Sequence, residues 1–379
     1  MENVEKYYER AVELYKTLHQ HAELEFDLPE TIGIVKKELD AYKIEYTEKY
    51  GKGSIVAEIG KGEKIIALRS DMDALPIEEN SGFTFSSKNK GCMHACGHDS
   101  HTAILLSVAR YLKENEDKLN VKVRLIFQPS EEGIKSGAEM MVANGVMEGV
   151  DHIVCTHSKN ELVVGKIGVC YGDYMAACTA VTIRFSGKPS HAALPKFGIN
   201  ANDMGSEAYI LIKSAVKELA NGKPYIWNVG SIVGGHASNI VSGEYTMKIS
   251  FRYYDMGFAT DVNQKVNEIC KEVATRYGGK YEMVWISSTI PVHNDEKITE
   301  IFETTLKTAG IPVETIPSEM ISEDFAHYLT KAPGMLFRFG TRNEEKGCTA
   351  AAHCNDFRID ESGMKPAIQA FCDYVMNMA

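Results

Sequence analysis

Apolar residues follow two alternating spacings along the first half of the chain. Short apolar runs that end in polar turns predict strands, whereas apolar residues three and four positions apart predict amphipathic helices. Strands are expected in GSIVAEIG (53–60), KIIALRSDMDALP (64–76), NVKVRLIFQPSEEG (120–133) and the end of SGAEMMVANGVMEGVDHIVCTH (136–157). Helices are expected at the opening of the chain, in HTAILLSVARYLKEN (101–115) and at the start of segment 136–157. This alternation predicts an α/β layer with functional residues at strand ends.

The order of predicted strands and helices changes after about residue 177. Strand patterns at 178–187, 225–235, 244–254 and 280–289 enclose helical patterns at 201–220 and 259–277. That order, β-α-β-β-α-β, is typical of a ferredoxin-like α+β sandwich. Helix and strand patterns alternate again after it, and the chain ends in a helix. We therefore predict a small domain, 177–289, inserted into a larger discontinuous domain made of 1–176 and 290–379.

Length and composition agree with a two-domain soluble globular protein of ordinary type. At 379 residues the chain exceeds the size at which one hydrophobic core stops growing. The formal charge of −11 is spread along the chain, which argues against a nucleic-acid partner. We see neither a signal-peptide pattern nor a run of about eighteen apolar residues, so we expect a cytoplasmic protein that does not enter membranes. Its nine cysteines are expected to be reduced thiols.

One short stretch, GCMHACGHDSH (91–101), concentrates metal-ligand residue types. Cys96 and His98 lie two positions apart, and a thiolate with an imidazole suits zinc and other divalent first-row metals. Two ligands do not make a site. A structural zinc knuckle would need a second nearby pair, which the sequence lacks. Buried thiols beside a helix-capping histidine remain the simpler alternative for this stretch alone.

Further ligands must come from distant strand ends, and the sequence offers Glu131, Glu132, His157 and His353. Adjacent glutamates are most often a charged surface. Here they directly follow an apolar strand, where α/β sheets collect ligands. One glutamate can bind metal while its neighbour, pointing the other way, handles the proton of a bound water.

Six ordered motifs resemble the M20 metallopeptidases over nearly the whole chain. They are SDMDALP (70–76), MHACGHDSHTAILL (93–106), FQPSEEG (127–133), GKPSHAALP (187–195), SEDFAHYL (322–329) and GTRNEEKG (340–347). Within that family they are most similar to the amidohydrolase branch, which contains N-acyl-amino-acid amidohydrolases, hippurate hydrolases and plant auxin-conjugate hydrolases. The resemblance implies a metal-dependent exopeptidase-like catalytic domain with an inserted lid and dimerisation domain.

The resemblance also implies roles for residues of the larger domain. Five ligands would hold two divalent ions, zinc or manganese, with cobalt and nickel also suitable: Cys96, His98, Glu132, His157 and His353. The Cys96 thiolate is expected to bridge the ions, and Glu131 resembles the general base. Asp73 resembles a supporting carboxylate that hydrogen-bonds a ligand histidine. For Asp71 we expect a simple turn, and for Cys92, His94 and His101 packing or supporting roles.

In the inserted domain, His191 resembles a histidine that reaches the partner subunit's active site and stabilises the oxyanion. Asn239 and Arg252 match positions that hold the substrate carbonyl or carboxylate, and an arginine suits a carboxylate because its fork binds both oxygens. Arg252 is equally well interpreted as a positively charged side chain on a surface strand. The role of His191 predicts a homodimer, or a higher oligomer of dimers, built through the lid.

The activity implied is hydrolysis of N-acyl amino acids to a carboxylate and a free amino acid. Alternatives are a carboxypeptidase or dipeptidase, an N-acetyl-diaminopimelate deacetylase, a catalytically silent ligand-binding homologue and a structural-zinc scaffold. The chain departs from the family pattern after His157, in HSKNELVVGKIG (157–168), and around His353, in AAHCND (351–356). We expect the polar residues after His157 at the rim of the metal site, where they would change which acyl group or side chain fits.

Overall fold

The computed structural model describes residues 4–378, which form two compact units. The first unit contains the chain up to Tyr174, His293–Pro317 and the chain from Asp324 onward. The second contains Met175–Val292 and Ser318–Glu323. Each unit has its own hydrophobic core.

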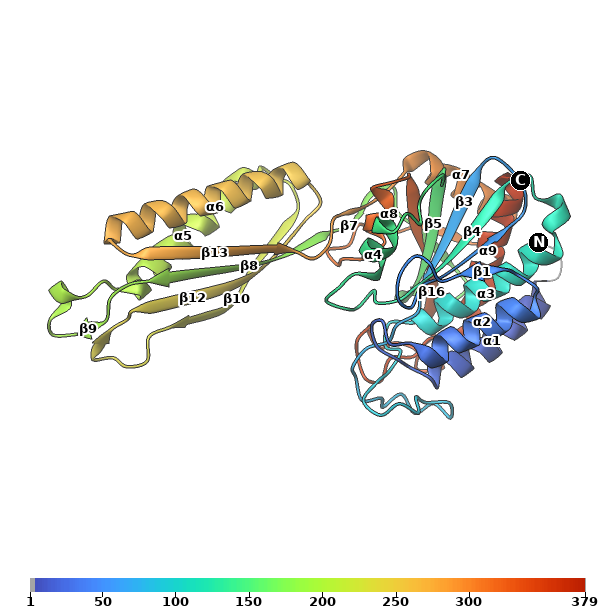
Figure 1. The fold of residues 1–379 in the computed structure, drawn as a ribbon, viewed down its shortest axis with the longest axis horizontal. Helices are drawn as coiled ribbons and strands as arrows, with labels where there is room; N and C mark the ends of the chain where they lie inside the picture. The colour runs from blue at the N-terminus through green and yellow to red at the C-terminus, as the bar shows by residue number, and fades with distance from the viewer. Residues whose placement is uncertain (1–3, 379) are drawn as a thin grey trace. The chain divides into compact units, whose positions relative to one another are not determined.

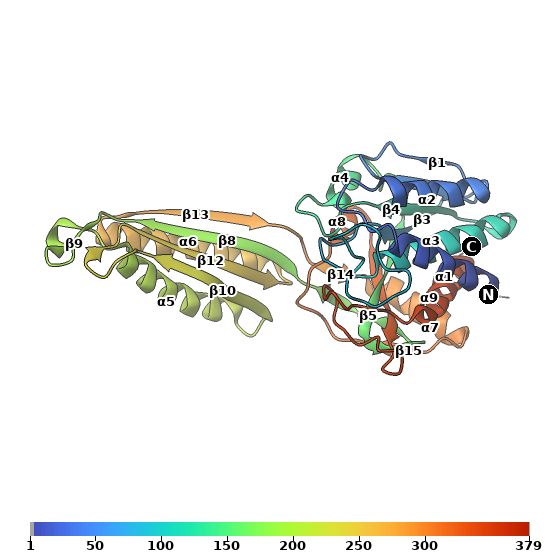
Figure 2. The same ribbon diagram turned by 90° about the horizontal axis from the view of Figure 1, so that it is seen from below.

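An eight-stranded sheet forms the centre of the first unit, in the order β1-β2-β4-β3-β5-β16-β6-β15. Its strands are β1 (Tyr46–Thr47), β2 (Ile55–Ile59), β3 (Ile65–Asp71), β4 (Lys122–Gln128), β5 (His152–Val163), β6 (Ile167–Val169), β15 (Val313–Thr315) and β16 (Gly334–Arg342). The helices are α1 (Glu5–His19), α2 (Pro29–Ala41), α3 (His98–Glu114), α4 (Gly137–Ala143), α7 (Glu296–Thr308), α8 (Ala326–Leu329) and α9 (Met364–Met378). Helices α1, α3, α7 and α9 pack in one continuous layer (Figure 1), and α4 packs against α8 (Figure 2).

The four central strands, β4, β3, β5 and β16, are parallel. Their apolar residues pack against the helix layer, so the strands are almost continuously buried, as expected for a covered parallel sheet. Parallel strands bring their carboxyl ends to one edge of the sheet. The segments that follow β3, β4 and β16 therefore leave the sheet at the same edge, and these segments carry the predicted site residues of this unit other than His157, which lies within β5.

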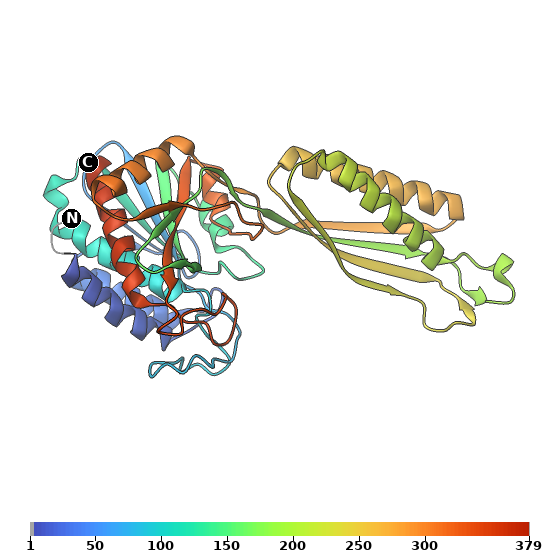
Figure 3. The ribbon, with the colours of Figure 1, turned by 180° about the vertical axis from the view of Figure 1, so that it is seen from behind.

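The second unit confirms the predicted β-α-β-β-α-β order. Its four-stranded antiparallel sheet, β10-β12-β8-β13, contains β8 (Ala177–Ser186), β10 (Tyr225–Gly234), β12 (Glu244–Tyr253) and β13 (Lys280–Ser287). Burial alternates along β8 and β12 because α5 (Ala201–Ala220) and α6 (Met256–Tyr277) cover one face, side by side in Figure 3. The short strand β9 (Ser190–His191) pairs with β11 (Ile240–Val241) in this unit. Strand β7 (Gly172–Met175) pairs with β14 (Val292–Asn294), and the boundary between the two units falls within both of these strands.

Segment Ser318–Glu323 groups with the second unit, although the sequence pattern places it in the larger domain. The Ala176 N–H donates to the carbonyls of Glu319 and Ile321, and Arg252 donates to the carbonyl of Met320 at 2.8 Å. Among the described residues, no helix is both long and apolar enough to cross a membrane.

Candidate metal centre

Gly97 allows Cys96 and His98 to lie on either side of a sharp turn at the start of α3. Its φ of 90° is in the left-handed region that disfavours side chains. A Cβ built at Gly97 would lie 2.5 Å from Ser158 Oγ, so any side chain here would also collide with β5. The motif therefore needs glycine between its two ligand candidates.

The His98 ring is fixed by a hydrogen bond from Nδ1 to the main-chain carbonyl of Asp73, at 2.8 Å. That bond leaves Nε2 as the free nitrogen, and Nε2 is buried without a hydrogen-bond partner among the described residues. Burial alone would lower the pKa of His98, yet the charges of Asp71 and Cys96 raise it well above its usual value. The surroundings of His98 thus favour a positive charge at this point, which a metal ion can supply.

The His157 ring is oriented in the same way from β5. Its Nδ1 donates to the carbonyl of Ser158 at 2.8 Å, and its Nε2 lies 3.3 Å from Cys96 Sγ. Burial and the nearby charge of Arg338 keep the pKa of His157 well below its usual value. The imidazole is therefore neutral, which is the form that binds metal.

Asp73 holds the glutamate pair by the backbone. Its carboxylate accepts the N–H of Glu131 at 2.9 Å and the N–H of Glu132 at 3.0 Å. The expected hydrogen bond to a ligand histidine is made instead by the main-chain carbonyl of Asp73, while the carboxylate lies 3.6 Å from His98 Nδ1. Asp73 therefore links the loop after β3 to the loop after β4.

Glu132 and His353 meet at 3.0 Å, between Oε1 and Nε2. His353 lies on a loop with a left-handed φ of 67°, and its N–H donates to the carbonyl of Ala95 at 2.8 Å. The ion pair raises the pKa of His353. For Glu132, burial alone would raise the pKa, but the charges of His353 and His98 lower it.

Two of the donor groups share Cys96. Within each of them every donor atom lies within 4.8 Å of the others, and they are Cys96 with His98 and His157, and Cys96 with Glu132 and His353; His98 lies equally close to Glu131 and Glu132. Burial and the Glu132 carboxylate raise the pKa of the Cys96 thiol to about 12, so the thiol needs a nearby cation to ionise at neutral pH. A thiol shared by two donor groups, together with the unpartnered His98 nitrogen, fits a pair of metal ions.

Comparisons with known proteins bear on what this centre is. The family model for peptidase family M20/M25/M40 matches residues 67–377, most of the chain. The chain belongs to the M20/M25/M40 peptidase family. The predicted family resemblance is thereby confirmed, and the chain is a hydrolase that acts on amide bonds.

Similar M20 proteins carry related names. An N-acetyl-L-cysteine deacetylase of Bacillus subtilis is 35% identical over 350 residues, covering 92% of this chain and 83% of the relative. An N-acyl-L-amino acid amidohydrolase of Geobacillus stearothermophilus is 37% identical over 280 residues, covering 73% and 76%. A Bacillus subtilis crystal structure described as a dinuclear metal-binding M20 peptidase superposes with a TM-score of 0.87 at 29% identity, covering 98% of each chain. The fold is therefore that of a dinuclear metal-binding M20 peptidase.

The expectation of a simple turn at Asp71 is wrong. Asp71 ends β3, is fully buried, and pairs with Arg69 at 2.7 Å. It also accepts from His101 Nδ1 at 2.6 Å, while His101 Nε2 accepts the Ser158 N–H at 2.9 Å. His101 is thus a neutral support of β5. The sequence signal of this buried network is the charged pair Arg69 and Asp71, which directly follows the apolar residues of β3.

Arg69 continues the network to Asp324, at 2.9 Å between Nη2 and Oδ1. Asp324 also accepts from Gln128 and Ser136, and its N–H lies 3.4 Å from Glu131 Oε1. Its motif, SEDFAHYL (322–329), supports the family resemblance, but no role for Asp324 follows from the sequence alone.

The predicted residues of the second unit fall into two places. His191 and Asn239 lie together at the exposed β9–β11 strand pair, where the Ala192 N–H donates to the Asn239 carbonyl at 2.9 Å. Arg252 pairs with Cys178 at the beginning of β8, whereas β9 follows the end of that ten-residue strand. The strand length separates them by roughly 30 Å within the chain.

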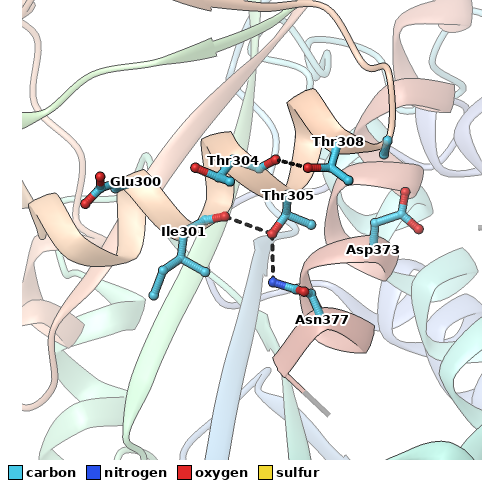
Figure 4. A pocket seen from close by; sticks show the side chains of 8 residues that line it. Glu300, Ile301, Thr304, Thr305, Thr308, Asp373 and Asn377 are labelled. Carbon is cyan, nitrogen blue, oxygen red and sulfur yellow. Dashed lines mark hydrogen bonds between the residues drawn. The ribbon is translucent and has the colours of Figure 1, made fainter.

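A pocket of about 570 Å³ lies between α7 and α9 (Figure 4). Thr305 accepts a hydrogen bond from Asn377 there, and Glu300 and Asp373 stand at its sides. Its lining contains none of the predicted site residues. The candidate centre is therefore defined by side-chain geometry and not by this pocket.

Proposed function

We propose that this M20 chain is a two-metal amidohydrolase that cleaves N-acyl amino acids, such as acetyl or benzoyl derivatives. The products would be a carboxylate and a free amino acid. The observation that carries the proposal is the pair of donor groups that share Cys96, with the Glu131 carboxylate 3.9 Å from His98 Nε2. The names of the relatives at 35% and 37% identity support this substrate class.

Five residues would hold the two ions: Cys96, His98, Glu132, His157 and His353. A thiolate, imidazoles and a carboxylate suit zinc or manganese, and cobalt and nickel also accept this ligand set. When bound, the ions would polarise the amide carbonyl and acidify a water.

Glu131 would act as general base. The hydrogen bond from the Glu131 N–H to Asp73 fixes the backbone at this residue, and the carboxylate extends from that fixed backbone. It would take the proton of the attacking water as the water adds to the amide carbon, and return that proton to the leaving nitrogen. The glutamate thus ends the reaction in the state in which it began.

The second unit would act as lid and dimerisation domain, with 177–289 inserted between 1–176 and 290–379. His191, beside Asn239 at the exposed β9–β11 strand pair, would stabilise the oxyanion in the neighbouring subunit of a homodimer. Arg252 would hold the substrate carboxylate. If this strand pair serves the neighbouring subunit, His191 and Arg252 need not meet within one chain, and their separation along β8 supports this division.

The enzyme would work in the cytoplasm, and the chemistry of its thiols supports this. All nine cysteines lie among the described residues and none forms a disulfide, which suits a reducing compartment.

The test is amino-acid release from N-acetyl, N-benzoyl and longer N-acyl amino acids, and from dipeptides, with zinc or manganese added. Glu131→Gln removes the base while keeping the size of the side chain, and we expect kcat to fall by about 10²- to 10⁴-fold. Glu139→Gln, a change in the first turn of α4, is the matched control and should keep the wild-type rate. Full activity in Glu131→Gln would refute the base assignment, and an inert wild type would favour the silent homologue.

A further inference from the structure

Two polar residues after His157, Ser158 and Asn160, point into the protein and not to the rim of the site, whereas Lys159 is part-buried and Glu161 is exposed. β5 continues through these residues to Val163, and Ser158 and Asn160 are only 6% and 4% exposed. The expectation that these two side chains select the acyl group from the rim is therefore wrong. Each side chain binds backbone of a segment that carries a predicted ligand, beginning with Ser158 Oγ, which donates to the carbonyl of Cys96 at 3.0 Å.

Asn160 uses its whole amide group to hold one loop. Nδ2 donates to the carbonyls of Ala350 and Arg358, both at 2.8 Å, and Oδ1 accepts from the hydroxyl of Thr341. The two carbonyls lie on either side of His353 in the sequence. A single buried side chain on a central strand therefore closes the loop that presents this ligand candidate.

The loop around His353 needs such support because it contains no helix or strand. His353 has a left-handed φ of 67° and a half-exposed side chain. Two backbone hydrogen bonds join the loop to other segments, from the His353 N–H to Ala95 and from the Asn80 N–H to the Asn355 carbonyl at 2.7 Å, and two more, from the N–H groups of Cys354 and Phe357, lie within the loop. Asn160 adds two ties from a strand that cannot shift without breaking the sheet.

We propose that Asn160 is a positioning residue for metal binding. By fixing the loop that holds His353 beside Glu132, it sets the affinity for the ion that these two residues bind. The inference rests on the proposed two-metal function. Removing an outer support of a metal ligand typically lowers metal affinity about 10- to 100-fold, so the effect is large enough to measure.

The experiment is a cobalt titration of the metal-free full-length chain, followed by absorption spectroscopy and calorimetry. We expect Asn160→Ala to weaken one ion about 10- to 100-fold and to leave the other unchanged. His353→Ala should weaken the same ion, and adding Asn160→Ala to it should cause no further loss. Asn294→Ala is the matched control, because this buried amide likewise donates to two carbonyls, of Cys170 and Leu336, in the same unit. It should lower the melting temperature and keep both affinities.

Asn160→Asp separates hydrogen bonding from packing. The carboxylate keeps the shape of the amide but has no donor for the two carbonyls, so it should weaken the same ion at least as much as Asn160→Ala. Wild-type affinity in Asn160→Asp would overturn the proposal. So would an Asn160→Ala protein that loses thermal stability like Asn294→Ala while binding both ions normally, or one that weakens both ions equally.

The wild-type chain tests the proposed enzymatic function separately from the role of Asn160. A wild-type chain that binds two ions but releases no amino acid would refute the proposed substrate class and leave the Asn160 result standing. A wild-type chain that binds no ion beside His353 would refute both.

Discussion

The two donor groups of the centre are held by different means. Cys96, His98 and His157 are at most 8% exposed and lie on α3, on β5 or directly beside them. Glu132 and His353 lie on loops, and the side chain of His353 is 52% exposed. One half of the centre is thus fixed by secondary structure, and the other half by side chains that bind loop backbone.

This difference indicates which substitutions should disrupt each of the two donor groups. In the buried half, His98 and His157 each donate to a main-chain carbonyl, so their rings follow the backbone. In the loop half, the carboxylate of Asp73 and the amide of Asn160 are the attachments. A single substitution should therefore affect one half and spare the other, unless it changes the turn at Cys96 that both halves share.

Gly97→Ala changes that shared turn and has the largest expected effect. The new Cβ would combine a left-handed φ of 90° with a contact of 2.5 Å to Ser158 Oγ, so Cys96 and His98 must move. We expect kcat/KM to fall by more than about 100-fold, because misplacement by about 1 Å is that costly, and both ions to bind more weakly. Gly165→Ala is the control, since its φ is also 90° but nothing lies within 4 Å. Equal losses in the two variants would show that backbone strain, and not ligand displacement, is responsible.

Asp73→Asn acts on the loop half and should have an intermediate effect. The amide offers one acceptor oxygen where the carboxylate receives the N–H groups of Glu131 and Glu132. We expect kcat/KM to fall about 10- to 100-fold and the ion held by Glu132 to bind more weakly. Steady-state kinetics and a metal titration measure both. Asp151→Asn removes a carboxylate that accepts the Ile65 N–H at 2.7 Å elsewhere in the unit, and it should change neither quantity.

His19→Gln should have the smallest effect on activity and a clear effect on stability. His19 is buried between Asp99 at 2.7 Å and Glu79 at 3.1 Å. Burial alone would lower its pKa, but the two carboxylates raise it from 6.5 to about 9. The protonated ring therefore stabilises the fold fully below pH 6.5, and this stabilisation is lost as the pH rises towards 9.

The pH dependence of unfolding measures this contribution. For the wild type we expect the free energy of unfolding to fall by on the order of 3 kcal/mol across that interval. His19→Gln should flatten the curve. The same slope in His19→Gln and wild type would contradict the assignment.

The sequence predicted regular elements well where periodicity is strong. Helix α5 has the expected bounds, 201–220, because its apolar positions repeat over five turns. Helix α2 was not predicted, and β5 was expected to end near His157. The first four residues of β5 beyond His157 are polar, which locally indicates a turn. Ser158 and Asn160 are buried among them because distant carbonyls accept their hydrogen bonds, and no local pattern encodes that.

Local sequence patterns are limited in the same way for the residues of the candidate metal centre. Three of the five ligand candidates, Cys96, His98 and Glu132, lie within the motifs that carry the family resemblance, whereas His157 and His353 lie outside them and are implied by the resemblance alone. A packing or supporting role was expected for His101, but the roles of Asp71 and Asn160 were not, because these residues act through contacts between segments far apart in the sequence. Such contacts become visible only when the sheet has placed its strand ends together.

The most direct test of the central claim is a crystal structure of the metal-loaded chain, with anomalous diffraction recorded at the absorption edge of the added metal. With zinc, we predict two anomalous peaks, both about 2.3 Å from Cys96 Sγ, one beside His98 and His157 and the other beside Glu132 and His353. A single ion, or a second ion that does not contact Cys96, would contradict the account.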